Sequence, residues 1–228
     1  MSNSKKIESL INHRLKMVAS FIEKDCYMID VGCDHALLDI YLASIYKEIK
    51  IIASDNKKGP LDGAYENIKK YHLEDRIQLK LGNGIEPIQN DVDTIVISGM
   101  GGLNMIGILK YKTELLSNIQ TIILSPNSDT EKVRKEITKL GYKIENEQLV
   151  KEKHIIYPIL VFKKGRKHYS RREYLFGPIL LERKDSIFLE YMESQRALKE
   201  KLLELLPKKY IQRRMELKRE LKIIEKNL

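Results

Sequence analysis

Short apolar runs alternate with amphipathic stretches through the first two thirds of this 228-residue chain, and this alternation constrains the fold more than any other feature. Runs of about five apolar residues rich in Ile and Val are typical of buried strands, and apolar residues at steps of three and four are typical of helices. Strands that alternate with helices predict a mostly parallel sheet with helices on both faces. The predicted strands span 27–32, 50–55, 76–82, 93–99 and 121–126, and the predicted helices span 36–47, 60–71, 102–115 and 129–141.

Both ends of this predicted domain depart from the alternation. Residues 5–24 carry apolar side chains at helical spacing on one face, which predicts an N-terminal helix. Residues 142–165 form two β-rich runs with no helix between them, and an antiparallel C-terminal edge strand explains that pattern. We therefore expect residues 1–165 to form one α/β domain. Its element order resembles that of the class I methyltransferase version of the Rossmann-like fold.

Residues 166–228 differ from the rest of the chain in pattern and in charge. A leucine-rich helical face over 186–206 ends at Pro207, and a second apolar stripe runs through 217–228. Two helices joined by a short break predict an antiparallel, coiled-coil-like helical hairpin. This segment holds 17 Lys and Arg against 10 Asp and Glu, which is most of the net charge of +9. The excess indicates a polyanionic partner, with a solvated lysine-rich helix face as the alternative.

Composition excludes several classes of protein. No apolar run approaches the ~18 residues of a membrane span. The charged N-terminus lacks the apolar region of a signal peptide, so we expect a cytoplasmic protein. Cys26 and Cys33 are not spaced like zinc ligands, and no metal site is expected.

Polar and glycine residues follow every parallel strand of the predicted sheet. Ligands of open α/β sheets bind beyond the carboxyl ends of the strands, and five polar clusters in succession there indicate a binding site rather than five ordinary turns. Asp55 lies 25 residues after Asp30, at the end of the next strand. An acid at this place accepts hydrogen bonds from both hydroxyls of a ribose and repels a 2′-phosphate, although a helix-capping role is the alternative.

The segment DVGCDH, which begins at Asp30, indicates the ligand. A dinucleotide fingerprint has two further glycines after Gly32 so that the backbone can approach a pyrophosphate, whereas this chain has Cys33, Asp34 and His35. The carboxylates of Asp30 and Asp34 repel a pyrophosphate and attract a cation. S-adenosylmethionine, which carries an ammonium and a sulfonium group, therefore fits this segment better than NAD. His35 has three candidate roles: orienting the turn, touching the substrate, or capping the next helix.

Several motifs together resemble a known family. They are DVGCDH, the turn SGMGG at 98–102, the pair Pro126-Asn127, the stretch that contains Arg14-Leu15 and Val18-Ala19, and the segment from Arg171-Arg172-Glu173 to Gly177-Pro178. The combination resembles the TrmK family of bacterial tRNA (adenine-N1)-methyltransferases, which modify adenine 22 in the D-arm of tRNA, and it covers essentially the whole chain. One departure is Ser125, where we expect glutamine before the Pro-Asn pair.

The resemblance implies S-adenosylmethionine as the cofactor and tRNA as the partner of this chain, which we expect to be a monomer. The resemblance implies that residues 98–101 and Asn127 face the target base. The candidate cofactor-binding residues are Asp30, Gly32, Cys33, Asp34, His35, Asp55, Asn56, Asn83, Gly84, Ser98, Gly99 and Met100.

Methylation of adenine N1 needs few catalytic groups. N1 has a free lone pair, so catalysis can rest on aligning it with the methyl group and the sulfur atom. A carboxylate near the ring favours the cationic transition state, and Asp34 is the candidate. Ser98 or a backbone carbonyl of the glycine turn accepts the N–H of the exocyclic amine. Asp34, Ser98 and Asn127 are thus the candidate catalytic residues.

N1 lies on the Watson–Crick edge of adenine, so the base must be exposed or flipped at a cost of a few kcal/mol. Phosphate contacts from basic side chains help to offset that cost. We expect the basic helical hairpin to clamp the tRNA. The candidate RNA-binding residues are Arg171, Arg172, Lys208, Lys209, Arg213 and Arg214.

Two other readings of the sequence stay open. In the first, the chain is a class I methyltransferase that acts on another RNA or on a protein. In the second, it is an RNA-binding protein that keeps the fold but does not catalyse methyl transfer. The acid at Asp55 and the intact glycine turn at 98–102 argue against the second of these. A dehydrogenase is the weakest option because of the charges in DVGCDH.

Overall fold

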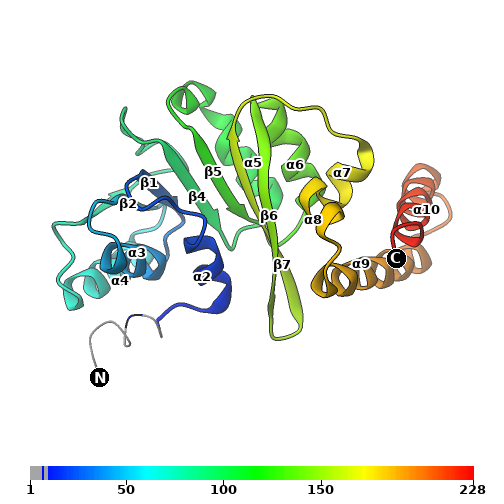
Figure 1. The fold of residues 1–228 in the computed structure, drawn as a ribbon, viewed down its shortest axis with the longest axis horizontal. Coiled ribbons are helices and arrows are strands. Elements are labelled where there is room, and N and C mark those ends of the chain that lie inside the picture. Colours follow the sequence, from blue (N-terminus) through cyan, green and yellow to red (C-terminus); the bar gives the residue numbers. More distant parts are fainter. Residues whose placement is uncertain (1–6, 8–9) are drawn as a thin grey trace. The chain divides into compact units, whose positions relative to one another are not determined.

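The computed structural model describes residue 7 and residues 10–228, which divide into two compact units, Met1–His168 and Tyr169–Leu228 (Figure 1). The sequence placed the boundary after Gly165, close to this division. The predicted helix over 5–24 lies partly outside the described residues. Ile7 is helical, and within residues 10–24 the helical part is the short helix α2, His13–Ala19.

The first unit is built on one seven-stranded sheet in the order β3-β2-β1-β4-β5-β7-β6. Strands β1 to β5 are parallel. The strand order reverses between β1 and β4, which pair with each other: β2 and β3 lie beyond β1, and β5 lies beyond β4. The strands are β1 Tyr27–Val31, β2 Lys50–Asp55, β3 Ile77–Leu81, β4 Thr94–Ser98, β5 Thr121–Ser125, β6 Tyr142–Glu152 and β7 Ile155–Lys164. This is the α/β arrangement that the alternation of strands and helices predicted.

The antiparallel part of the sheet is the β6–β7 hairpin. β7 pairs antiparallel with both β5 and β6 and lies between them, so the edge strand is β6. The sequence predicted the antiparallel pair but not this insertion of the last strand. A buried ion pair between Arg134 and Glu147, 2.6 Å apart, ties β6 to a neighbouring helix.

Helices cover the sheet and bury its apolar strands. β1 and β5 are buried along their whole length, which is why their sequences read as continuous apolar runs. The helices of this unit after α2 are α3 Leu37–Ile45, α4 Lys58–Lys70, α5 Gly102–Tyr111, the short 3-10 helix η1 Thr113–Leu116, and α6 Thr130–Lys139. Both α3 and α4 pack on β2 and β3, and α6 packs on β6 and β7.

The second unit is helical. A capping box between Ser170 and Glu173 starts α7, Arg171–Phe176, and Gly177, with a φ of 90°, separates it from α8, Pro178–Arg183. α9, Ser186–Leu205, and α10, Ile211–Glu225, then pack together as the predicted hairpin.

The contacts of α9 with α10 run antiparallel. Lys199 pairs with Glu220 at 2.7 Å, and Arg214 donates to the carbonyl of Leu203 at 2.7 Å. The packing differs from the apolar seam that the spacing predicted, because Leu198, Leu202 and Leu205 of α9 are exposed, whereas Leu217, Leu221 and Ile224 of α10 are buried. Across the described residues, the longest helices are too polar to cross a lipid bilayer.

Candidate functional site

Two cavities open at the carboxyl ends of the parallel strands, where the strand order reverses. The larger has a volume of about 440 Å³ and the smaller about 220 Å³. Gly32, in the turn after β1, lines both of them. The two cavities therefore form a site that straddles this turn, as expected for a ligand of an open α/β sheet.

The Gly32 turn favours glycine because its φ is +79°. A Cβ at this position would lie 2.1 Å from Cε of Met100, so the flexible end of that side chain would have to move. The N–H groups of Gly32 and Cys33 both donate to the carbonyl of Ser54, at 2.8 and 3.0 Å, which fastens the turn to the end of β2. The backbone path here is thus fixed by sterics and by main-chain hydrogen bonds.

The larger cavity contains the predicted residues at the ends of β2, β3 and β4: Asp55, Asn56, Asn83, Gly84 and Met100. Asp55 accepts a hydrogen bond from the N–H of Lys57 at 2.9 Å, but it does not cap α4. The sequence missed one face of α5, which lines this cavity with Leu103, Asn104, Gly107, Ile108 and Tyr111. Their steps of three and four residues were the available signal.

The smaller cavity contains the remaining predicted cofactor-binding residues: Asp30, Cys33, Asp34, His35, Ser98 and Gly99. All twelve candidate cofactor-binding residues therefore line one cavity or the other. The structure rules out the capping role for His35, because the residue before α3 is Ala36 and no side chain caps this helix. The sequence analysis missed Asn12, Arg14 and Leu15, which bring the N-terminal segment to the wall of this cavity.

Two buried acids lie beneath the Gly32 turn. Asp30 is the penultimate residue of β1 and is 5% exposed, and Asp39 on α3 is completely buried. The pKa of Asp30 is raised to about 7, mainly by burial; the proximity of Asp39 opposes this shift and the charge of Asp55 adds to it. Burial and then the charge of Asp30 raise the pKa of Asp39 well above its ordinary value. The pair therefore keeps at least one proton at neutral pH, which reduces the negative charge that the sequence assigned to this side of the site.

The turns after β4 and β5 are joined by main-chain hydrogen bonds. Gly99 N–H donates to the Ser125 carbonyl at 3.1 Å, Asn127 N–H donates to the Met100 carbonyl at 2.8 Å, and Gly102 N–H donates to the Ser128 carbonyl at 3.2 Å. The Asn127 side chain adds a fourth bond, from Nδ2 to the Gly99 carbonyl at 2.5 Å. Asn127 does not line the smaller cavity, but it directly holds Gly99, which does.

Ser125, the departure from the expected glutamine, is fully buried and hydrogen-bonded. Its Oγ accepts a bond from Nε of Arg14 at 2.8 Å and donates to the carbonyl of Pro158 at 3.1 Å. The side chain at position 125 thus points into the protein, where it links β5 to α2 and β7, and its carbonyl faces the joined turns.

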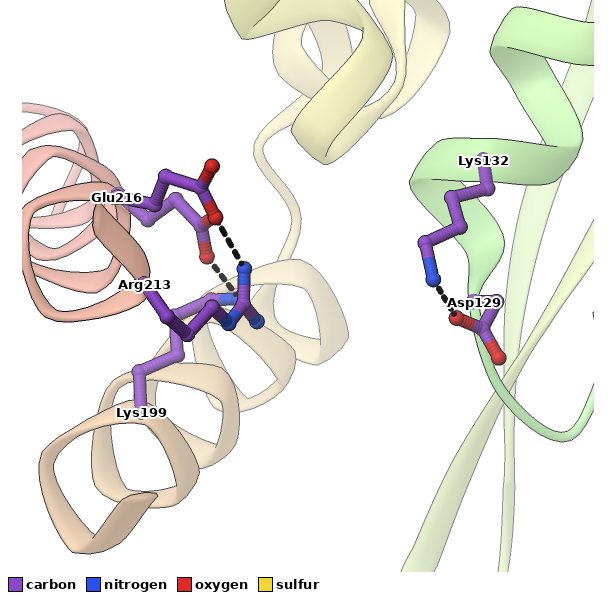
Figure 2. A network of polar contacts seen from close by, with 6 residues as sticks. Asp129, Lys132, Lys199, Arg213 and Glu216 are labelled. Atoms are coloured by element: carbon purple, nitrogen blue, oxygen red, sulfur yellow. Dashed lines mark hydrogen bonds and ion pairs between the residues drawn. The ribbon is translucent and has the colours of Figure 1, made fainter. Parts of the chain in front are cut away.

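The candidate RNA-binding residues of the second unit differ in exposure and in their partners. Arg171, Arg172, Lys208 and Lys209 are exposed. Arg213, also exposed, lies 2.9 Å from Glu216, and Figure 2 shows the two side chains turned toward each other along α10. Arg214 donates to the carbonyls of Leu203 and Leu206 at 2.7 and 2.5 Å, so it closes the end of α9.

This division follows from the chemistry of the groups. A guanidinium that satisfies two helix-end carbonyls has a structural role that costs stability to remove. Arg214 is therefore a poor candidate for a phosphate contact, and Arg213 is partly neutralised by its own helix. In the part of the chain that the structure describes, no three His, Cys, Asp or Glu side chains gather as metal ligands would.

Comparisons with known proteins show what this chain is similar to. A family model, TrmK, described as tRNA (adenine(22)-N(1))-methyltransferase, matches residues 28–226. The tRNA (adenine(22)-N(1))-methyltransferase of Bacillus subtilis (strain 168) is 30% identical over 190 residues, 80% of this chain and 80% of that protein. A Streptococcus pneumoniae protein solved in complex with S-adenosyl-L-methionine is 31% identical with a TM-score of 0.87, over 96% of this chain and 99% of that one. M. capricolum TrmK, solved with S-adenosyl-homocysteine, is 26% identical with a TM-score of 0.83, over 95% and 97%.

Proposed function

Because the chain belongs to the TrmK family of tRNA (adenine(22)-N(1))-methyltransferases, we propose that its two cavities hold S-adenosylmethionine across Gly32. The protein transfers a methyl group from this cofactor to N1 of adenine 22 in tRNA. The assignment of residues to the cofactor depends on one observation: Gly32 lines both cavities. The larger cavity contains Asp55 and the smaller one contains Asp34.

The larger cavity suits the adenosine part of the cofactor. The Asp55 carboxylate, at the end of β2, accepts hydrogen bonds from the ribose hydroxyls. The apolar side chains of Met100 and Ile108 and the small residues Gly84 and Gly107 give a flat base room to lie against the chain. The smaller cavity suits the amino acid part, where Asp30 and Asp34 face an ammonium group.

The target adenine meets the methyl group at the β4 end of the smaller cavity. S-adenosylmethionine supplies the methyl group on a sulfonium leaving group. The chain aligns N1 with that group, and alignment of this kind supplies up to about 7–11 kcal/mol in the best cases. The carbonyl of Gly99 and the hydroxyl of Ser98 accept the exocyclic amine, Asn127 holds Gly99, and the Asp34 carboxylate favours the positive charge that develops on the ring.

The second unit provides the electrostatic contact with the tRNA body in this proposal. Its exposed basic side chains at Arg171, Arg172, Lys208 and Lys209 suit phosphate groups, which bind guanidinium and ammonium without regard to sequence. We infer that the protein works as a monomer in the cytoplasm, with the D-arm of tRNA brought to the smaller cavity.

The reaction is tested with labelled S-adenosylmethionine and two unmodified tRNA transcripts that differ only in having adenine or guanine at position 22. We expect label only with adenine, recovered as 1-methyladenosine. Equal labelling of both transcripts would move the target elsewhere in the RNA. Cofactor binding without labelling of any transcript would point to a protein that keeps the fold without turnover.

The RNA contact is tested by the salt dependence of tRNA binding. Replacing Lys208 and Lys209 by Gln should lower the slope of log K against log salt by about 1 for each phosphate contact that is lost. Lys69→Gln with Lys70→Gln on α4 is the matched control, because these two lysines are also adjacent and exposed. A slope that falls equally in both double variants would overturn the assignment to the helical hairpin.

A further inference from the structure

Arg14 is a buried cation in the wall of the smaller cavity, and the proposed methyl transfer assigns it no role. It comes from α2, near the beginning of the described chain, and it is 7% exposed. Its guanidinium donates from Nε to Ser125 Oγ at 2.8 Å, from one terminal nitrogen to Asn127 Oδ1 at 2.8 Å, and from the other to the Ser125 carbonyl. Two of these bonds go to Ser125, the last residue of β5, and the third goes to Asn127 in the turn that follows.

The β6–β7 hairpin holds Arg14 from the opposite side. The guanidinium lies 4.0 Å from the centre of the Tyr157 ring, a cation–π distance. The Glu152 carboxylate accepts hydrogen bonds from the main-chain N–H of Arg14 at 2.9 Å and from the Asn12 side chain at 3.2 Å. Burial lowers the pKa of Arg14, while Tyr157 and Glu152 raise it, and an arginine in this setting keeps its charge.

These contacts determine which way the Asn127 amide points. Since Arg14 is a pure donor, it must face the oxygen of the amide, so Nδ2 must face the other way. Nδ2 donates to the carbonyl of Gly99 at 2.5 Å. A carbonyl oxygen has two lone pairs, so the Gly99 carbonyl keeps one for a second donor such as the exocyclic amine of adenine.

A buried charge is retained at a desolvation cost of several kcal/mol, and apolar residues of similar volume often give more stability. The fork of Arg14 bonds both the side chain and the carbonyl of Ser125 as well as the amide of Asn127. Packing of α2 against the sheet does not require these three hydrogen bonds, which indicates that they have another role.

We propose that Arg14 is a positioning residue for methyl transfer, which fixes the Asn127 amide and through it the Gly99 carbonyl that receives the target adenine. This inference rests on the proposed function of the site. Arg14 touches neither reacting atom in it, and its effect reaches the base through two hydrogen bonds in series, Arg14 to Asn127 and Asn127 to Gly99.

A competing role for Arg14 follows from its place in the cavity wall. A guanidinium there is also able to bind the carboxylate at the amino acid end of the cofactor. The two roles differ in what they predict. A carboxylate anchor changes the affinity for S-adenosylmethionine, and a positioning residue changes the rate of methyl transfer with the cofactor already bound.

The experiment compares Arg14→Met and Arg14→Lys with the unaltered protein by single-turnover methyl transfer to tRNA and by calorimetric binding of S-adenosylmethionine. For Arg14→Met we expect a rate at least about 100-fold lower, since a misplacement of about 1 Å can cost that much, and a cofactor Kd within about threefold of the original. Arg14→Lys keeps the charge but not the fork, so it should stay at least about tenfold slow.

Arg76→Met is the matched control. Arg76 also donates to main-chain carbonyls, those of Tyr46 and Lys47, but at the opposite ends of the strands. We expect its rate of transfer to match the unaltered protein. Thermal unfolding of each variant shows which ones are folded, and Arg14→Lys carries the comparison if Arg14→Met does not fold.

A double-mutant cycle with Asn127→Ala decides whether Arg14 acts through Asn127. Adding Arg14→Lys to Asn127→Ala should lower the single-turnover rate by less than about threefold, because the residue through which Arg14 acts is already gone. Full additivity would overturn the inference, and so would a rise in the cofactor Kd as large as the loss of rate. Failure of the unaltered protein to methylate tRNA would overturn the proposed function itself, before any variant is compared.

Discussion

The buried pair Asp30 and Asp39 makes the stability of the first unit depend on pH in a way that Asp39→Asn should change. A carboxyl whose pKa is raised on folding stabilises the folded protein most fully below its unfolded pKa, and that stability is lost as the pH rises through the folded pKa. For Asp30 this window runs from the ordinary 3.8 to about 7. Keeping one proton on a carboxyl at pH 7 therefore costs about 4 kcal/mol relative to the unfolded chain.

Asp39→Asn removes a carboxyl whose pKa is raised on folding. The free energy of unfolding of the variant, minus that of the unaltered protein, should therefore rise as the pH increases from 5 to 7, by at most about 1.4 kcal/mol per pH unit for one proton. Titrating groups distant from the pair cancel in the difference, because both proteins contain them, whereas Asp30 contributes to it because its pKa depends on Asp39.

The measurement is urea unfolding at pH 5, 6 and 7, followed by far-ultraviolet circular dichroism. The transition of the first unit is identified as the one that S-adenosylmethionine shifts to higher urea. Asp62→Asn, at an exposed acid of α4, is the matched control for replacing an acid by its amide. A pH-independent difference for Asp39→Asn would refute the reasoning, since it would mean that Asp39 is ionised in the folded protein.

Three further substitutions test other parts of the structure. Gly32→Ala should weaken cofactor binding by at least tenfold in calorimetry and destabilise the first unit by about 1–2 kcal/mol, because φ is +79° and the added Cβ would overlap Met100. Asp55→Ala should raise the Kd for S-adenosylmethionine about tenfold to 100-fold, from the loss of charge-assisted bonds to the ribose, and leave the Kd for tRNA unchanged in filter binding. Arg214→Ala should lower the helix content and melting temperature of the second unit by uncovering the carbonyls of Leu203 and Leu206, without the change in salt slope expected for a phosphate contact.

The grouping of the predicted residues around the two cavities was predictable because it depends on local rules. A strand end, a glycine turn and an acid at the next strand end are each visible within a few residues, and parallel strands bring their carboxyl ends to one edge of the sheet. Asp30, Gly32 and Asp55 therefore came together as expected. The face of α5 that lines the larger cavity was not predictable, since a helical spacing does not say what each face meets.

Arg14 was missed for a related reason. Its partners Ser125 and Asn127 lie 111 and 113 residues away, and no local pattern reports a contact at that separation. The α9 leucines show the same limit in the opposite direction. Their spacing predicted a buried stripe, but these leucines are exposed, and Lys199 of α9 pairs with Glu220 of α10.

The joined turns after β4 and β5 have a consequence for inhibition and resistance. Among the groups proposed to receive the adenine there, the Gly99 carbonyl belongs to the main chain, and the Asn127 side chain holds it in place. A point mutation replaces side chains and leaves peptide groups in place. A compound that recognises this edge through the Gly99 carbonyl would therefore face an acceptor that single substitutions cannot delete, and escape would have to come from steric blockage or from substitutions that displace this carbonyl, such as those at Asn127 or Arg14.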